Sequence, residues 1–213
     1  MELQYFGANC IKITTKNTSI VIDDNLQSLG LKSIVKNDDV AVYTQKELEK
    51  TNEKITPKLI IDEPGEYEVS NVSVQGIAAR SHLDEEAKKS ATVFKITLDD
   101  TKIAVVGHIY PELTDKQLEA LGMIDILVVP VGGNGYTLDG IGALKIIKKI
   151  EPKIVIPTHY ADQGVSYEVP QQELDAVLQQ LSMEPAETVE KLKIRSEEHT
   201  SELQSRGLIS YAV

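Results

Sequence analysis

The sequence has no tryptophan, two phenylalanines and a single cysteine among its 213 residues. One cysteine excludes an internal disulfide, and the apolar neighbours of Cys10 predict a small buried side chain rather than a nucleophile. No apolar stretch is long enough to span a bilayer, and the opening MELQYFGANC lacks the basic and apolar regions of a secretory signal. We therefore expect a protein of the reducing cytoplasm that has no membrane partner.

Positive charge is also scarce, because 22 Lys and Arg residues stand against 33 Asp and Glu residues and leave a net charge of −11. This balance argues against a nucleic-acid partner, which needs a concentrated basic surface. The one basic cluster, Lys145, Lys148, Lys149 and Lys153, is typical of the solvated face of a helix end. Hydrophobic residues make up 41% and charged residues 26% of the chain, which predicts an ordinary soluble domain with a sizeable core.

Only four histidines are present, and three of them follow apolar runs that predict β-strands. His82 follows VQGIAARS, His108 follows IAVVG and His159 follows IVIPT. A side chain at the end of a strand can face a shared cleft, and three imidazoles delivered in this way could bind one metal ion. The alternative is three unrelated polar residues in turns, but their similar contexts favour a common site.

The order of the predicted elements indicates an α/β (α+β) fold. Strands dominate the first hundred residues, where Lys16-Asn17 and Asp99-Asp100 predict the turns of antiparallel hairpins. Thr44-Gln45-Lys46-Glu47 fits a capping box and predicts a short helix. Beyond this half, apolar strands alternate with amphipathic helices, which indicates a sheet covered by helices. The predicted strands are 2–6, 10–14, 19–23, 40–43, 59–61, 67–69, 72–78, 92–98, 103–107, 124–131 and 153–157, and the later predicted helices are 114–121, 139–150 and 170–181.

Residues 195–206, RSEEHTSELQSR, look like the conceptual translation of a common short-read sequencing adapter. We therefore predict one domain over residues 1–194 and an artefactual tail over residues 195–213, with the natural C-terminal sequence lost. On this interpretation His199 is not a ligand candidate. The alternative is a polar, solvated C-terminal helix, and resequencing of the locus distinguishes the two.

Five segments, taken in order, resemble the metallo-β-lactamase-fold hydrolases, in particular the branch that includes the ascorbate-phosphate lactonase-like proteins. Together these segments cover nearly all of residues 1–170. The resemblance implies a four-layer αββα sandwich with a metal cleft along one edge between the two sheets, and it implies hydrolysis as the reaction class. The segments are GANCIKI (7–13), IVIDD (20–24), PGEYEV (64–69), the run 105–139 that contains VVPVGGNGYTLD, and IVIPTHYAD (154–162).

The chain departs from this family where the family binds its metals. The family's His-x-His-x-Asp-His segment is replaced here by Gln45–Lys50, in which only Glu47 and Glu49 could ligate a metal. On a helix, residues two apart point in different directions, so these two glutamates do not make a pair of ligands. The family's bridging aspartate is His108 here, and the histidine of its opening Gly-His motif is Ala8. We therefore expect that the two-metal centre, with ions roughly 3.5–4 Å apart, does not form.

The resemblance places His82 and His159 on two remaining ligand positions of the family. With His108 they make a three-histidine set that suits a single divalent ion, Zn or Mn, with an open position where the metal could activate water. Metal-bound hydroxide would then act as the general base, with help from Asp24 or Glu47. The alternative is a metal-free site that keeps its histidines as hydrogen-bonding residues.

A run of small residues, Gly132, Gly133 and Asn134, follows one of the buried strands. Backbone N–H groups in such a run can approach an anionic ligand, although a tight turn explains the glycines equally well. Tyr136 and Thr137 come next and are candidate substrate contacts.

Charged residues near the predicted site complete the candidate set. Arg80 could bind a carboxylate or phosphate of a substrate, with a structural ion pair as the alternative. The resemblance gives Asp23 a supporting role through hydrogen bonds. Asp162 could orient an imidazole, and Asp139 could support the site or cap the following helix, as could Thr137.

Two functional hypotheses follow. The first is a hydrolase with at most one metal ion that acts on a small ester, lactone or phosphoester. The second is a catalytically inactive pseudoenzyme that binds a small molecule or a protein. Loss of the signature segment favours the second hypothesis, whereas the preserved GGNGYTLD and PTHY segments argue against complete loss of function.

Overall fold

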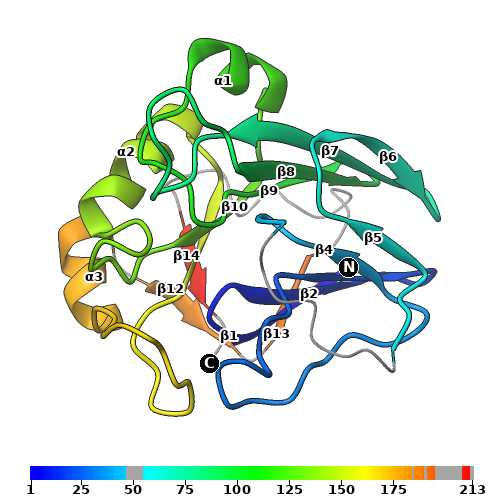
Figure 1. The fold of residues 1–213 in the computed structure, drawn as a ribbon, viewed down its shortest axis with the longest axis horizontal. Helices are drawn as coiled ribbons and strands as arrows, with labels where there is room; N and C mark the ends of the chain where they lie inside the picture. Colours follow the sequence, from blue (N-terminus) through cyan, green and yellow to red (C-terminus); the bar gives the residue numbers. More distant parts are fainter. Residues whose placement is uncertain (47–54, 184, 190, 195–207, 212–213) are drawn as a thin grey trace.

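The computed structural model describes residues 1–46, 55–183, 185–189, 191–194 and 208–211, which form two mixed β-sheets and three helices (Figure 1). The first sheet has six strands, and its hairpins β1–β2 and β2–β3 are antiparallel, the second as the turn at Lys16-Asn17 predicted. β3, β4 and β5 continue it in parallel. In spatial order the strands are β13 (Lys191–Lys193), β1 (Glu2–Gly7), β2 (Cys10–Thr14), β3 (Ser19–Ile22), β4 (Val40–Val42) and β5 (Leu59–Ile61).

The second sheet has eight strands and changes from antiparallel to parallel along its width. β6 to β9 form an antiparallel meander, whereas β9, β10 and β11 are parallel to one another. Every residue of β10 is buried, so this strand must be covered on both faces. In spatial order the strands are β12 (Pro185–Thr188), β14 (Leu208–Tyr211), β11 (Ile154–Thr158), β10 (Ile126–Pro130), β9 (Thr101–Val105), β8 (Ala91–Leu98), β7 (Val72–Ala79) and β6 (Gly65–Val69).

Three helices, α1 (Asp115–Leu121), α2 (Gly140–Ile150) and α3 (Leu174–Leu181), lie on the side of the eight-stranded sheet away from the six-stranded sheet (Figure 1). Thr114 and Gln117 form a capping box at the start of α1, which confirms that predicted helix. Asp139 caps α2, as one of the two interpretations of this residue predicts.

The prediction of a helix from residue 170 is wrong at its N-terminal end, because α3 begins only at Leu174. Gln172 instead donates its backbone N–H to the Gly132 carbonyl and accepts from the N–H of Ala161. These two bonds hold the segment extended against neighbouring loops, so tertiary pairing overrides the signal of Pro170.

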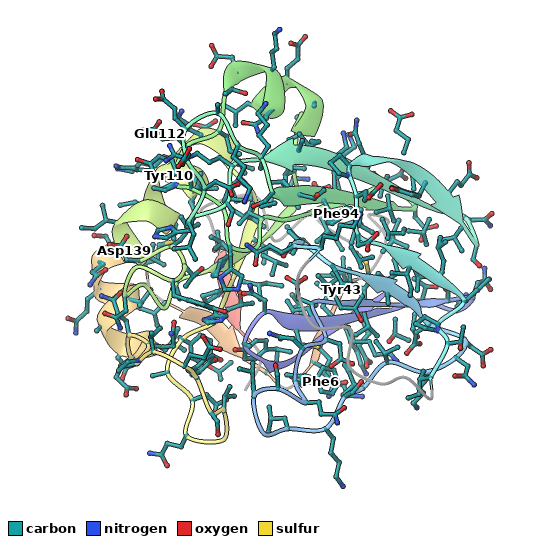
Figure 2. All side chains as sticks on the ribbon, in the orientation of Figure 1. Phe6, Tyr43, Phe94, Tyr110, Glu112 and Asp139 are labelled. Carbon is teal, nitrogen blue, oxygen red and sulfur yellow. The ribbon has the colours of Figure 1, made fainter. Side chains whose placement is uncertain are left out.

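The main core fills the space between the two sheets. Ile11 and Ile13 from β2 face Phe94 and Ile96 from β8 in one continuous buried cluster, and Figure 2 labels Phe94 among these side chains. Each such side chain stabilises the fold by about 1.5–3 kcal/mol relative to an exposed position. This core fixes the strand ends that carry the histidines.

Two predictions concern segments that the structure describes in part. The helix expected from Thr44 runs into residues 47–54, which lie outside the described residues, as do Glu47 and His199. Within the expected foreign tail, Leu208–Tyr211 forms β14 and pairs in parallel with β11 and β12. None of the helices in the described ranges is long and apolar enough to cross a membrane.

Candidate functional site

Two of the three predicted histidines lie in ring contact. His108 follows β9 and His159 follows β11, and these strands flank β10 in parallel, so their carboxyl ends meet at one edge of the sheet. The two ring centroids are 4.8 Å apart and the planes are nearly perpendicular, at 87°. Both side chains are buried. Parallel topology therefore explains why two histidines 51 positions apart in the chain meet here.

The third histidine is attached to this pair through the backbone. The His82 N–H donates to the His108 carbonyl at 2.9 Å, and the neighbouring residue Ser81 bridges to Ile109. The buried Nδ1 atom of His82 has no hydrogen-bond partner within the part of the chain that is described.

Both paired imidazoles are held neutral at pH 7. Burial and, to a smaller extent, the neighbouring His159 together lower the pKa of His108 to about 3, against the opposing effect of the hydrogen bond to the Tyr136 carbonyl. Burial likewise lowers the pKa of His159 to about 4, although its hydrogen bond to Gln171 raises it. A neutral imidazole can act as a hydrogen-bond acceptor or a metal ligand, whereas an imidazolium cannot.

Two tyrosines extend the histidine pair into an aromatic cluster. The Tyr136 ring meets His108 edge-on at 5.1 Å and lies 5.7 Å from His159. The Tyr167 ring lies 4.9 Å from His159 on a tilted plane. Tyr136 was predicted as a substrate contact, whereas nothing in the sequence singled out Tyr167.

The three histidines do not assemble a metal site in this structure. Over the described ranges, no three His, Cys, Asp or Glu residues gather in a way that could hold a metal ion. A catalytic zinc ion ordinarily needs three protein ligands, so the described residues do not fit the metal that the resemblance implies. The three-histidine metal site stays a prediction.

Gln45, which the resemblance places on the family's first histidine ligand, donates its amide to the Ser81 hydroxyl at 2.9 Å. Gln45 also bridges to Ala91, and the preceding Thr44 carbonyl accepts the N–H of Thr92 at 2.8 Å. A hydrogen-bonding side chain thus ties the start of the replaced segment to the neighbour of His82.

Asp23 and Gly107 both lie against Thr44, the residue that precedes Gln45. The Asp23 carboxylate accepts from the Thr44 N–H and from its hydroxyl, each at 2.7 Å. Burial raises the pKa of Asp23 to about 7 despite these two bonds. A Cβ on Gly107 would lie 2.3 Å from Thr44 Oγ1, so only glycine lets the chain pass at this point before His108.

The loop of residues 132–137 uses several of its N–H groups internally. Gly133 donates to the Leu138 carbonyl, and Tyr136 and Thr137 both donate to the Gly133 carbonyl. These three N–H groups are therefore the donors of a turn, and their hydrogen bonds do not leave them free for an anionic ligand. The Asn134 amide donates to the Pro170 carbonyl, and the buried Thr137 hydroxyl has no partner among the described residues.

The structure places the predicted charged residues in structural contacts. Arg80 lies over the Tyr110 ring, 3.9 Å from its centroid, and donates to the Asp84 carbonyl at 3.0 Å. Asp24 accepts three hydrogen bonds of 2.8 Å from residues 33–35. Asp162 accepts from the Gly164 N–H at 2.8 Å. Glu47, the other predicted base, lies outside the described residues.

Gln171 contacts His159, and the sequence analysis did not identify this residue. Its Oε1 atom lies 3.1 Å from His159 Nδ1, in the place where Asp162 was expected to act. The residue comes from the extended segment before α3, twelve positions after the histidine. No spacing rule or motif connects a loop glutamine with a histidine at that distance, so only the tertiary fold identifies it.

Comparison with known proteins gives consistent results. The family profile described as "Beta-lactamase superfamily domain" matches residues 2–159. A UPF0173 protein of Pyrococcus abyssi is 25% identical over 183 residues, which cover 77% of this chain and 85% of that protein. A UPF0173 metal-dependent hydrolase of Carboxydothermus hydrogenoformans is 47% identical over 45 residues, which cover 21% of this chain and 20% of that protein.

Solved structures show the same fold. A Thermotoga maritima protein of the metallo-β-lactamase superfamily superposes with a TM-score of 0.73 at 22% identity, and each chain is covered completely. Igni18, a metallo hydrolase of Ignicoccus hospitalis, gives a TM-score of 0.62 at 18% identity, with 91% of this chain and 99% of that chain covered. These matches confirm the predicted sandwich class.

Proposed function

This chain belongs to the beta-lactamase superfamily, and we propose that it is a member that binds a small ligand at the His108–His159 pair without hydrolysing it. The proposal corresponds to the pseudoenzyme interpretation of the sequence. It includes a cytoplasmic location, supported by the single buried Cys10, and neither a nucleic-acid nor a membrane partner.

One observation carries this proposal. Among the described residues no three metal-ligating side chains gather, whereas two neutral imidazoles lie in contact, 4.8 Å apart, in a buried aromatic cluster. A fold without its metal ligands lacks the means to activate water, but its neutral imidazoles can still accept hydrogen bonds. Gln45, Thr44 and Asp23 beside that site form hydrogen bonds with protein groups.

A single-metal hydrolase acting on a small ester, lactone or phosphoester is the second candidate. It is favoured by the hydrogen bonds at both Nδ1 atoms, since metal-binding histidines commonly donate that N–H to an oxygen. Relatives named metal-dependent hydrolases also favour it. A third ligand would have to come from His82 after rearrangement, or from outside the described residues.

Metal analysis distinguishes the two candidates. The full chain is purified without a histidine tag, and its Zn and Mn contents are measured by mass spectrometry for wild type, His108→Ala and His159→Ala. We expect far less than one ion per chain and no change in either variant. One bound ion per chain that is lost in both variants would refute the proposal and establish the single-metal candidate.

A further inference from the structure

Two short segments beside the histidine pair run antiparallel to each other, residues 80–82 after β7 and residues 108–110 after β9. Ser81 and Ile109 face each other at the centre of this pairing, flanked by two backbone hydrogen bonds of 2.9 Å, and both side chains are buried. Side chains alternate between the two faces of extended chains, so the flanking residues share the opposite face. These residues are Arg80, His82, His108 and Tyr110.

The guanidinium of Arg80 is held in place on this face by two contacts. Its Nε atom donates to the Asp84 carbonyl at 3.0 Å, and its central carbon lies 3.9 Å from the centroid of the Tyr110 ring. A side chain that is already held in one orientation loses little conformational entropy when it binds a ligand. Arg80 is therefore pre-organised for binding.

Most hydrogen-bond donors of this guanidinium are not used within the protein. Arginine carries five N–H donors, and in the part of the chain that the structure describes only the donor on Nε makes a hydrogen bond. The Arg80 side chain is half-buried, so it is not sealed from solvent. Its two terminal nitrogens form a planar fork that matches the two oxygens of a carboxylate or a phosphate.

The acidic residue closest in sequence does not neutralise this cation. The Asp84 carboxylate accepts from the N–H groups of Ser81 and Ser90 at 2.9 and 2.8 Å. It also pairs with Lys88 at 3.3 Å, and no Asp or Glu of the described ranges forms a salt bridge with Arg80. Partly buried charges are ordinarily paired, so an anionic ligand would supply the partner that Arg80 lacks.

We propose that the terminal nitrogens of Arg80 bind the carboxylate or phosphate group of a small ligand, and that Tyr110 is the positioning residue that holds the guanidinium for it. The inference rests on the proposed function and deepens it, because it assigns the charge of the ligand at the histidine pair. Arg80 lies two positions from His82, roughly 7 Å along an extended chain. A small molecule anchored at Arg80 is long enough to extend along the shared face toward the histidines.

The first test is binding of simple anions. The full chain is labelled uniformly with ¹⁵N, freed of metal with a chelator, and titrated at constant ionic strength with acetate, with inorganic phosphate and with glycerol as a neutral probe. The Nε–H signal of Arg80 is assigned by its absence from Arg80→Lys. We expect at least one anion to shift this signal and the neighbouring amide signals in a saturable way, and the tighter of the two to identify the anionic group. A response to neither anion, or an equal response to glycerol, would overturn the inference.

Variants test whether the fork of Arg80 is the binding group, with the amide signals of His82 and Tyr110 as the readout in each. Arg80→Gln should weaken anion binding at least about tenfold, and Arg80→Lys, which keeps the charge without the planar fork, about threefold to tenfold. Tyr110→Leu should weaken it about threefold, whereas Tyr110→Phe keeps the ring face and should restore binding. Circular dichroism confirms that each variant is folded.

Lys89→Gln is the matched control, because it removes one exposed positive charge from the same loop. It should change the anion affinity less than about twofold, since exposed charges are screened. Equal weakening in Lys89→Gln and Arg80→Gln, or wild-type affinity in folded Arg80→Lys, would refute the assignment of Arg80. Wild-type affinity in folded Tyr110→Leu would refute the role of Tyr110. Because these samples are metal-free, their outcome is independent of the metal analysis that tests the proposed function.

Discussion

Gly107 is a position where the identity of one residue decides whether the site can form. Its φ is +58°, and a Cβ there would lie 2.3 Å from Thr44 Oγ1. We expect Gly107→Ala to lower the free energy of unfolding by about 3 kcal/mol, from the left-handed backbone and the steric conflict together. Urea denaturation followed by circular dichroism measures this loss.

Gly135→Ala provides the comparison. Gly135 has a similar φ of +73°, but no heavy atom of the described residues lies within 4 Å of its added Cβ. This variant should lose only the backbone contribution, about 1 kcal/mol. Equal losses of unfolding free energy in the two variants would show that the steric conflict with Thr44 does not contribute to the effect of Gly107→Ala.

The buried titratable groups predict how stability changes with pH. The pKa values of His108 and His159 are depressed to about 3 and 4, so the unfolded chain takes up protons first as the pH falls below 6.5. Between pH 7 and pH 5 each histidine should remove about 2 kcal/mol of stability. Asp23 acts in the opposite direction, because its pKa is raised to about 7 in the folded protein. Folded Asp23 therefore takes up a proton between pH 7 and pH 5, whereas unfolded Asp23 does not, and this uptake stabilises the folded protein. It should restore about 2 kcal/mol at pH 5, leaving a net loss of about 2 kcal/mol.

Two variants separate these contributions. His159→Gln should abolish most of the net loss between pH 7 and pH 5, whereas Asp23→Asn should increase it to about 4 kcal/mol. Unfolding free energies from urea titrations at pH 5, 6 and 7 test both. A pH dependence of Asp23→Asn that equals that of the wild type would contradict the raised pKa of Asp23.

At the scale of elements, the sequence was most informative where one physical signal dominated. The predicted helix 114–121 matches α1, and the turn at Lys16-Asn17 predicted the β2–β3 hairpin. β12 and β13 were not predicted, because they are short and lack a periodic apolar pattern. The extended segment before α3 was predicted as helix, since its pairing with Gly132 and Ala161 is a tertiary effect.

The candidate site was predictable in part: in Tyr136, in Asp23 and above all in its histidines. Their positions after strands can be read from the sequence, and parallel pairing on either side of β10 brings His108 and His159 together. The sequence does not contain the distances that decide metal binding, nor the link from Gln171 to His159. Those depend on how loops from different elements pack.

Helix α2 offers a test of the two interpretations of Asp139. The Oδ1 atom of Asp139 accepts the Gly142 N–H at 2.7 Å, which is an N-cap hydrogen bond. Figure 2 labels Asp139 at the start of this helix. Asp139→Ala should lower stability by about 1 kcal/mol and leave the tautomers of His108 and His159 unchanged. Asp139→Asn should retain most of the stability, since asparagine also caps helices. A changed tautomer in Asp139→Ala would assign the residue to the site instead.

At the scale of the whole molecule, the question is which part of the chain makes the fold. Among the residues whose side chains are described, the main core runs from Leu3 to Leu192. The predicted foreign segment, 195–213, contributes β14, which pairs in parallel with β11 and β12. Backbone pairing places few demands on side-chain identity, so a strand at this position is compatible with a segment that was not selected for it.

We therefore expect a chain that ends at Ile194 to fold. Ile194 itself donates its N–H to the Met1 carbonyl at 3.0 Å and accepts from the N-terminal amine at 2.9 Å, so the last residue retained is anchored against β1. Removal of residues 195–213 should leave the unfolding transition cooperative and its midpoint within a few degrees of the full chain, since about 1 kcal/mol corresponds to roughly 2–4 °C at this size. Differential scanning calorimetry of the two proteins, alongside ¹⁵N-histidine spectra that report the His108–His159 pair, measures both consequences. A loss of cooperativity, or an altered tautomer of His159, would show that residues 195–213 are an integral part of the domain.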